Sequence, residues 1–286
     1  MSAKLVLRTF SAALCLVWIS AGPAVATESL PSKGALAAGD ALWAKRAEAL
    51  SGKLAAPEAI ESAIESYQTT QSDSPNELET RWKLLRALHY SVDFADRDDD
   101  AKEANVDQAV ALAHDSMELL ERGTGDDHNR ARVYFWSGIA WGIKASRVGL
   151  LTIVRDGLAT KMHDTAQKTA ELDPSVDQGG ALRLLSRLHA TIPRVPFISG
   201  WVDRGKSLGF AERALALDPS HPGTELIMAL ALLEREPNRK AEARTFLERV
   251  ASLTPRDDHR VEDLACAIRP ASSRTVDERK NCMEFS

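Results

Sequence analysis

Apolar residues recur along the chain at spacings of three, four and seven positions. One stripe runs from Leu36 to Leu50, and others occupy residues 60–67, 78–92, 106–120 and 181–192. This spacing places the apolar residues on one face of a helix. No run alternates strictly between polar and apolar residues, so no β-strand is predicted. We therefore expect an all-α fold.

Prolines and glycines separate these stripes. Ser74 with Pro75 and Glu77 forms a capping box, which predicts the start of a helix. Proline clashes with a continuing helix, and glycine readily adopts the left-handed conformation that ends one. Five positions are expected to end helices for these reasons: Pro174, Pro219, Pro255, Gly123 and Gly125.

The same breaks reveal a repeat. The stretches TAELDPS at 169–175, ALALDPS at 214–220 and VASLTPR at 250–256 share an apolar residue two positions before the proline. Small residues followed by a proline turn are typical of the second helix of a tetratricopeptide repeat. We expect about five helix pairs over residues 27–256, stacked as a compact right-handed solenoid. Stacked repeats leave a concave surface, which favours a binding role.

The first residues read as a cleaved signal peptide, residues 1–26. Lys4 and Arg8 precede a short apolar run, and Ala24-Val25-Ala26 supplies the small residues of a cleavage site. A retained anchor is the alternative, although the apolar run is short for a membrane span. Cleavage predicts a periplasmic chain whose formal net charge falls from −5 to −7 with the loss of two cations. Such an acidic chain is not expected to bind nucleic acid, and no later segment is apolar enough to span a membrane.

The C-terminal region, residues 257–286, is expected to be a tail. It contains Cys266 and Cys282, the two cysteines of the mature chain. In an oxidising compartment a pair this close in sequence is a candidate disulfide. Two free thiols remain the alternative, because spacing alone does not decide geometry.

Residues 131–219 resemble the T-component family of tripartite (TRAP) transporters, which are periplasmic tetratricopeptide proteins that accompany a solute-binding protein. Three stretches carry the resemblance: ARVYFWSGIAWGIKAS at 131–146, HDTAQKTAELDPSVDQGGALRLLSRLHATIP at 163–193 and WVDRGKSLGFAERALALDP at 201–219. The chain departs from the best-known members in lacking a lipidation cysteine. The resemblance implies an adaptor that docks a periplasmic solute-binding protein and holds an apolar small molecule in a groove or channel.

One helix of this region is rich in aromatic residues. Tyr134 and Trp141 share a face, while Trp136 points elsewhere. These three residues are candidates for lining a ligand groove or channel. The alternative is that they fill the core between repeats, as aromatic residues of buried helices usually do.

The segment TIPRVPFISGW at 191–201 is more than the short turn that a repeat needs. Its prolines and glycine prevent a helix, yet it is apolar. It either folds back over the core or presents an apolar patch to a partner, for which Phe197, Ile198 and Trp201 are the candidate contacts. If Trp201 lies on the surface, Trp201→Ala should change the free energy of unfolding by no more than about 1 kcal/mol.

No catalytic, metal or cofactor motif stands out. The acidic run 96–100 with Asp107 resembles a calcium loop, but Ala101 stands where that loop needs glycine, so a solvated acidic turn is expected. The histidines have no metal-binding spacing, and there is no phosphate-binding glycine loop or serine elbow. We therefore expect a binding protein, not an enzyme. The alternative function is a structural scaffold in the assembly of the cell envelope or a secretion complex.

Overall fold

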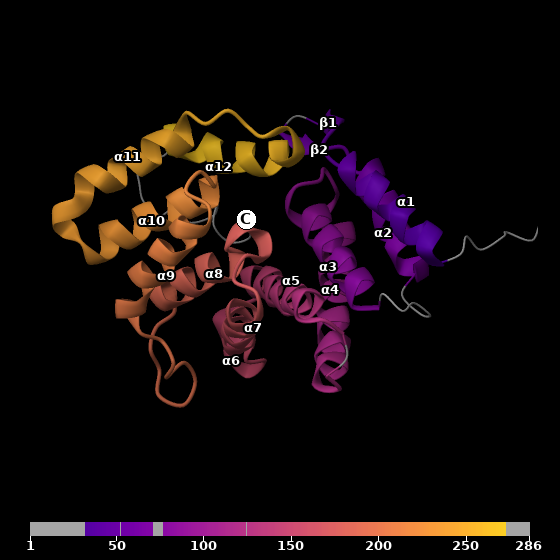
Figure 1. The fold of residues 1–286 in the computed structure, drawn as a ribbon, viewed down its shortest axis with the longest axis horizontal. Coiled ribbons are helices and arrows are strands. Elements are labelled where there is room, and N and C mark those ends of the chain that lie inside the picture. The colour runs from indigo at the N-terminus through magenta and orange to yellow at the C-terminus, as the bar shows by residue number, and fades with distance from the viewer. Residues whose placement is uncertain (1–31, 52, 71–76, 124, 273–286) are drawn as a thin grey trace, which may run out of the picture. The chain divides into compact units, whose positions relative to one another are not determined.

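The computed structural model describes residues 32–272, apart from residues 52, 71–76 and 124 and the side chains of residues 32, 33 and 268–272. The signal-peptide prediction, the capping box at 74–77 except for Glu77, and Cys282 lie outside the described residues. The described chain is helical almost throughout, as the periodicity predicts (Figure 1). The helices are α1 (Ser32–Ala44), α2 (Glu58–Thr70), α3 (Glu77–Asp93), α4 (Asp99–Glu121), α5 (Asp127–Arg147), α6 (Leu150–Arg155), α7 (Leu158–Leu172), α8 (Gly180–Thr191), α9 (Arg204–Leu217), α10 (Pro222–Arg235), α11 (Lys240–Ala251) and α12 (Arg260–Ser272).

Polar caps and left-handed residues set the helix ends. Asp98 accepts a hydrogen bond from the backbone N–H of Ala101 and begins α4. That helix ends before Gly123, whose φ of 72° is a conformation that glycine adopts without strain. The helices before Pro174, Pro219 and Pro255 end two to four residues before each proline, which confirms these predicted breaks.

Each helix packs mainly on its neighbours along the chain. Close associations join α1 with α2, α3 with α4, α5 with α7, α8 with α9, and α10 with α11, and α4 packs on α5 as closely as on α3. The short helix α6 is inserted between the partners of the third pair. Helices that pack in this way bury their apolar faces against one another, which explains why the apolar residues occupy one face of each helix.

A glycine allows the closest of these pairs to form. A Cβ added to Gly138 of α5 would stand 2.6 Å from Oγ1 of Thr165 in α7. The small residue thus lets the two helices approach more closely than any larger side chain would permit.

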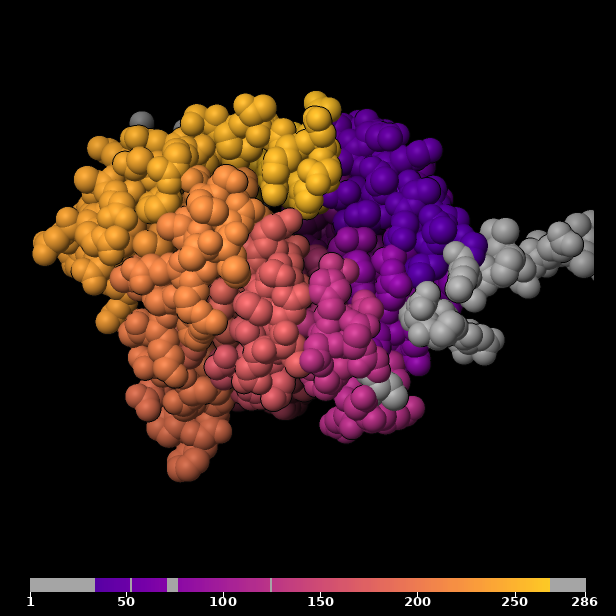
Figure 2. Space-filling view, in the orientation of Figure 1, coloured from indigo at the N-terminus to yellow at the C-terminus, as the bar shows by residue number. Residues whose placement is uncertain are grey.

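The core has two parts, and the last helix contacts both. One cluster is built from α1 to α8, and the other from α9 to α12. Val261 of α12 belongs to the first cluster and Cys266, one turn further along, to the second. Figure 2 shows the C-terminal helix against the N-terminal part of residues 32–272. Within the predicted C-terminal tail, α12 therefore packs against both parts of the core through Val261 and Cys266.

The region after α1 differs from the prediction. The apolar stripe that runs to Leu50 predicts a continuous helix, but α1 ends at Ala44. Leu50–Ser51 (β1) and Leu54–Ala55 (β2) instead form a short antiparallel hairpin. A two-residue strand is too short to show the alternating pattern by which strands are recognised, so the sequence carries no signal for it.

Candidate functional site

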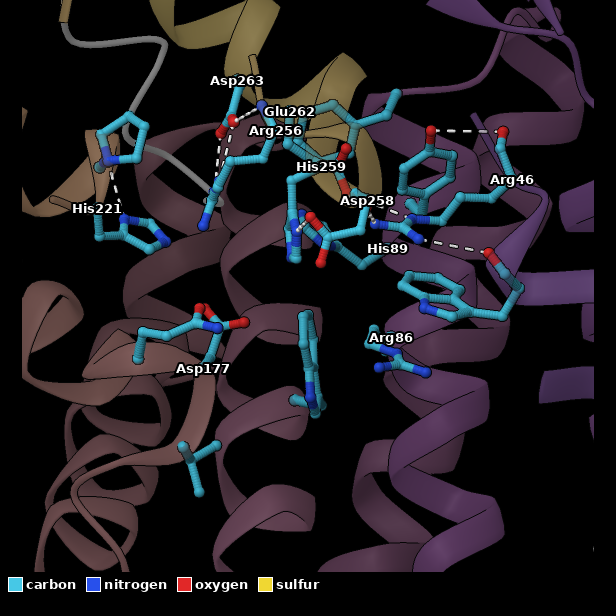
Figure 3. Close-up of a pocket in the computed structure, with 18 of the residues that line it drawn as sticks. Arg46, Arg86, His89, Asp177, His221, Arg256, Asp258, His259, Glu262 and Asp263 are labelled. Atoms are coloured by element: carbon cyan, nitrogen blue, oxygen red, sulfur yellow. Dashed lines mark hydrogen bonds and ion pairs between the residues drawn. The ribbon is translucent and has the colours of Figure 1, made fainter. Parts of the chain in front are cut away.

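The structure contains a cavity of about 470 Å³ between helices from the two ends of the chain (Figure 3). Residues of α1, α3 and α5 line one side, and residues 176–178 and the first turn of α10 line the other. Residues 256–266, which include the start of α12, complete the lining. The volume lies within the range of small-molecule binding sites.

Arginine and tryptophan side chains stack along one wall of this cavity. The guanidinium of Arg86 lies 3.9 Å from the ring centre of Trp43 and 4.8 Å from that of Trp82. Arg46 also lies over Trp43, at 4.2 Å, and Arg132 over Trp82, at 4.7 Å. Each contact is within the range of a cation–π interaction, in which the face of the ring attracts the charge. We call these five residues the arginine–tryptophan stack.

Arg86 is a half-buried cation of this stack, whereas Arg46 is 5% exposed. Burial lowers the pKa of Arg86 to about 10, an effect that the nearby charge of Arg46 adds to and that the interaction with Tyr67 opposes. The side chain therefore still carries its charge at neutral pH. Among the described residues no carboxylate lies within ion-pair distance of its guanidinium, so Arg86 brings a positive charge to the cavity.

Most carboxylates of the lining, by contrast, are paired with arginine. Glu262 pairs with Arg46, Asp263 with Arg256 and Asp177 with Arg183, each within 3.0 Å. The fourth carboxylate, Asp258, lies beside His259, and its side chain is 76% exposed, so that solvent screens its charge. The arginines without a carboxylate partner therefore contribute most to the charge of the cavity.

The wall opposite the stack contains a strained turn. Asp177 and Gln178 have φ values of 51° and 47°, which side-chain-bearing residues rarely adopt. Arg183, only 2% exposed, holds the turn by donating to the backbone carbonyl oxygens of both residues and to the Asp177 carboxylate. Such strain persists only where the surroundings enforce it, and it often occurs beside binding sites.

His221 lies next to this turn and is neutral. Its Nδ1 accepts hydrogen bonds from the backbone N–H groups of Gly223 and Thr224, so that it caps α10. Burial, together with the charges of Arg183 and Arg256, lowers the pKa of His221 to about 2. The ring is therefore neutral at neutral pH, forms part of the wall of the cavity and contributes no charge.

The three aromatic candidates of α5 lie in different surroundings. Trp136 lines the cavity, beside His89 at 5.6 Å between ring centres. Trp141 is 2% exposed and does not line the cavity, while Tyr134 is half-buried against the core. Of these three residues, only Trp136 lines the cavity.

The sequence analysis did not identify the arginine–tryptophan stack, although a signal for it exists. Arg46 follows Trp43 by three positions, and Arg86 follows Trp82 by four. Residues with these spacings are neighbours on a helix surface, and Arg86 stacks on Trp82 in this way within α3. Arg46 lies just after the end of α1 and reaches back over Trp43. The signal does not reveal that Arg86 also reaches Trp43, because that contact joins two helices.

A second feature is an exposed apolar surface formed by α6 and residues 193–200, called here the α6–loop surface. Eight large apolar side chains are exposed among the described residues, and six of them are on this surface: Leu150, Leu151, Val154, Val195, Phe197 and Ile198. Both segments adjoin the start of α7. The hydroxyl of Thr160 in that helix donates to the carbonyl oxygen of Ile198 at 3.3 Å.

The loop of this surface has a defined internal structure. The Ser199 hydroxyl accepts from the N–H of Val195 and donates to the carbonyl oxygen of Pro193. Phe197 adopts a φ of 65° and its side chain is fully exposed. Trp201 instead turns inward and stacks on His163, with 4.1 Å between ring centres. Of the three candidate contacts, Phe197 and Ile198 face solvent and Trp201 packs against the fold.

The remaining candidate residues have structural roles. Among the described residues, no group of histidine, cysteine, aspartate and glutamate side chains is arranged to hold a metal ion. Asp98 of the acidic run caps α4, and Asp107 pairs with Lys144. Cys266 is buried in the core, and its predicted pairing with Cys282 is not tested, because Cys282 lies outside the described residues.

Within the described part of the chain, no helix is long and apolar enough to cross a membrane. No protein-family model matches the sequence, and none of the curated proteins matches it significantly.

Proposed function

We propose that this protein is a helical-repeat adaptor that binds a protein partner through the α6–loop surface. The observation that carries the proposal is the concentration of six of the eight exposed large apolar side chains on that surface. Single exposed apolar residues are ordinary, but a cluster of them marks a site of interaction. The ordered loop presents Phe197 before any partner arrives, so little ordering is required on binding.

The arrangement of the helices supports a tetratricopeptide-like scaffold. The described helices can be grouped into about five consecutive pairs, the number expected from the proline breaks over residues 27–256. We propose that they form the right-handed solenoid of that repeat class. The inserted helix α6 and the inserted loop after α8 both interrupt the repeat pattern, and both belong to the α6–loop surface. Insertions on one side of a repeat array often form its binding face.

The nature of the partner is proposed from the family resemblance. Residues 131–146, 163–193 and 201–219 resemble T-components of tripartite transporters, and the loop of the α6–loop surface lies between the last two stretches. We therefore propose a periplasmic solute-binding protein as the partner. The signal peptide predicted at residues 1–26 supports the same compartment.

The test is capture of the partner from periplasmic extract, with identification by mass spectrometry and repetition with the purified solute-binding protein. Phe197→Asp and Leu151→Asp place a charge in the proposed contact and should abolish capture. Leu50→Asp is the matched control, since Leu50 is an exposed apolar residue of β1, outside the α6–loop surface. All variants should retain the helical circular dichroism spectrum.

Two results would contradict the proposal. If Phe197→Asp and Leu151→Asp bind the solute-binding protein as the unmodified chain does, the α6–loop surface is not the docking site. If the unmodified chain captures only components of an envelope or secretion assembly, the protein is a scaffold of that assembly and not a transport adaptor.

A further inference from the structure

We propose that the cavity is a binding site for a small, flat organic oxyanion, with the anionic group held by Arg86 and Arg132 and the ring or chain lying against Trp136. The carboxylate and the phosphate monoester are the two forms of this chemistry. The proposal does not depend on the partner proposed above. It also differs from the apolar ligand that the family resemblance implies, because the lining is rich in arginine.

The first argument is the charge of the lining. Arg86 and Arg132 have no carboxylate within ion-pair distance among the described residues, whereas three of the four lining carboxylates pair with arginine and the fourth, Asp258, is largely exposed to solvent. The nearest acid to influence Arg86 is Asp40, and its carboxylate already binds Lys83 at 2.7 Å and the hydroxyl of Tyr67 at 2.9 Å. Two positive charges on one wall therefore lack counterions, which favours an anionic ligand.

The second argument is the position and chemistry of Arg86. The side chain lines the cavity and is half-buried, so part of it is accessible to a ligand there. Guanidinium groups bind oxyanions especially well, through paired N–H donors.

The third argument is that the cations are held in position. Trp43 and Trp82 contact the guanidinium of Arg86, and Trp82 is itself fixed by a hydrogen bond from Nε1 to Asn129 Oδ1 at 2.9 Å. Arg132 stacks on the same indole. Side chains that are already ordered lose little conformational freedom on binding. The arginine–tryptophan stack is therefore preorganised for an anion.

The body of the ligand is expected to be flat and partly apolar. Trp136, Phe94 and Val176 supply apolar surface in the same cavity. A volume of about 470 Å³ accommodates a molecule of one or two rings. A small inorganic anion would leave these aromatic surfaces without contacts.

The experiment is a titration of the purified full-length chain with 2-naphthoate, followed by calorimetry and by tryptophan fluorescence. The neutral isostere 2-naphthamide is the matched ligand control, and 2-naphthyl phosphate distinguishes a phosphate site from a carboxylate site. We expect one of the two anions to bind at least tenfold more tightly than the amide. The affinity for that anion should fall as the salt concentration rises, because the attraction is partly screened.

Arg132→Gln should weaken binding of the anion at least tenfold and leave the amide unaffected. Arg132 is only half-buried, so this variant is expected to fold. Arg213→Gln is the matched control, since that guanidinium lies over the ring of Phe210 outside the cavity. The proposal is overturned if neither anion binds with a Kd below about 1 mM. Equal binding of the amide, or unchanged anion binding by Arg132→Gln, overturns it as well.

Discussion

At the scale of the residue, Phe197 and Trp201 show how one loop serves two purposes. The side chain of Phe197 is fully exposed, at a positive φ. Trp201 is half-buried, stacks on His163 and donates from Nε1 to the hydroxyl of Thr160 at 3.4 Å. The loop folds back on the core at Trp201 and leaves Phe197 exposed, because it turns back toward α7 between these residues. Trp201 anchors the loop against α7, and Phe197 is the fully exposed apolar side chain of the loop.

This division changes the expectation for Trp201→Ala. The substitution removes a stacked, half-buried indole, so it should lower the free energy of unfolding by about 2–3 kcal/mol. Phe197→Ala removes a side chain without packing partners and should change it by less than about 0.5 kcal/mol. Urea denaturation followed by circular dichroism measures both values. Equal effects of the two substitutions would show that Trp201 does not anchor the loop.

At the scale of the element, the pair α5 and α7 depends on a close approach at Gly138. The hydroxyl of Thr165 lies 2.6 Å from the place where a Cβ would stand, and it donates to the carbonyl oxygen of Lys161. A β-branched threonine within a helix has little freedom to rotate away. The packing of α5 on α7 therefore requires the absence of a side chain at this position.

Two glycine-to-alanine substitutions test this requirement. Gly138→Ala should destabilise the fold by about 1–3 kcal/mol, because the added methyl group overpacks the contact between the helices. Gly209→Ala, in α9, should stabilise it by about 0.5–1 kcal/mol, since a Cβ there meets no atom within 4 Å and alanine favours the helix. Thermal and urea unfolding of both variants give the comparison. A stabilising Gly138→Ala would show that the two helices can separate without cost.

The helices were largely predictable, because their signals are local. The prolines at 174, 219 and 255 follow the ends of helices, and each apolar stripe but the first falls within one helix. The cavity was not predictable in the same way. Arg86 meets Trp43 only after α1 and α3 are packed, and residues of α12 complete the lining only when the chain has folded back. Contacts between distant parts of the chain leave no periodic pattern in the sequence.

At the scale of residues 32–272, α12 connects the end of the fold to its beginning. Val261 joins the cluster formed by α1 to α8, and Glu262 forms an ion pair with Arg46 at 2.9 Å. Arg46 also donates to the carbonyl oxygen of Asp258 and is 5% exposed. The same contacts close one side of the cavity, so the stability of this connection and the integrity of the binding site are coupled.

Glu262→Gln tests the connection, since it removes the anion and keeps the size of the side chain. A buried guanidinium without its counterion is costly, and carbonyl oxygens compensate only in part. We therefore expect a loss of about 2–3 kcal/mol in the free energy of unfolding, measured with urea by tryptophan fluorescence, to which Trp43 beside Arg46 contributes. Glu248→Gln is the matched control. Its partner Arg244 is exposed and lies 3.8 Å away, so the loss should stay below about 0.5 kcal/mol.

If both substitutions have the same small effect, the contact of α12 with the N-terminal helices rests on Val261 and its apolar neighbours. In that case Val261→Ala, and not Glu262→Gln, should open the cavity and weaken binding of the anion.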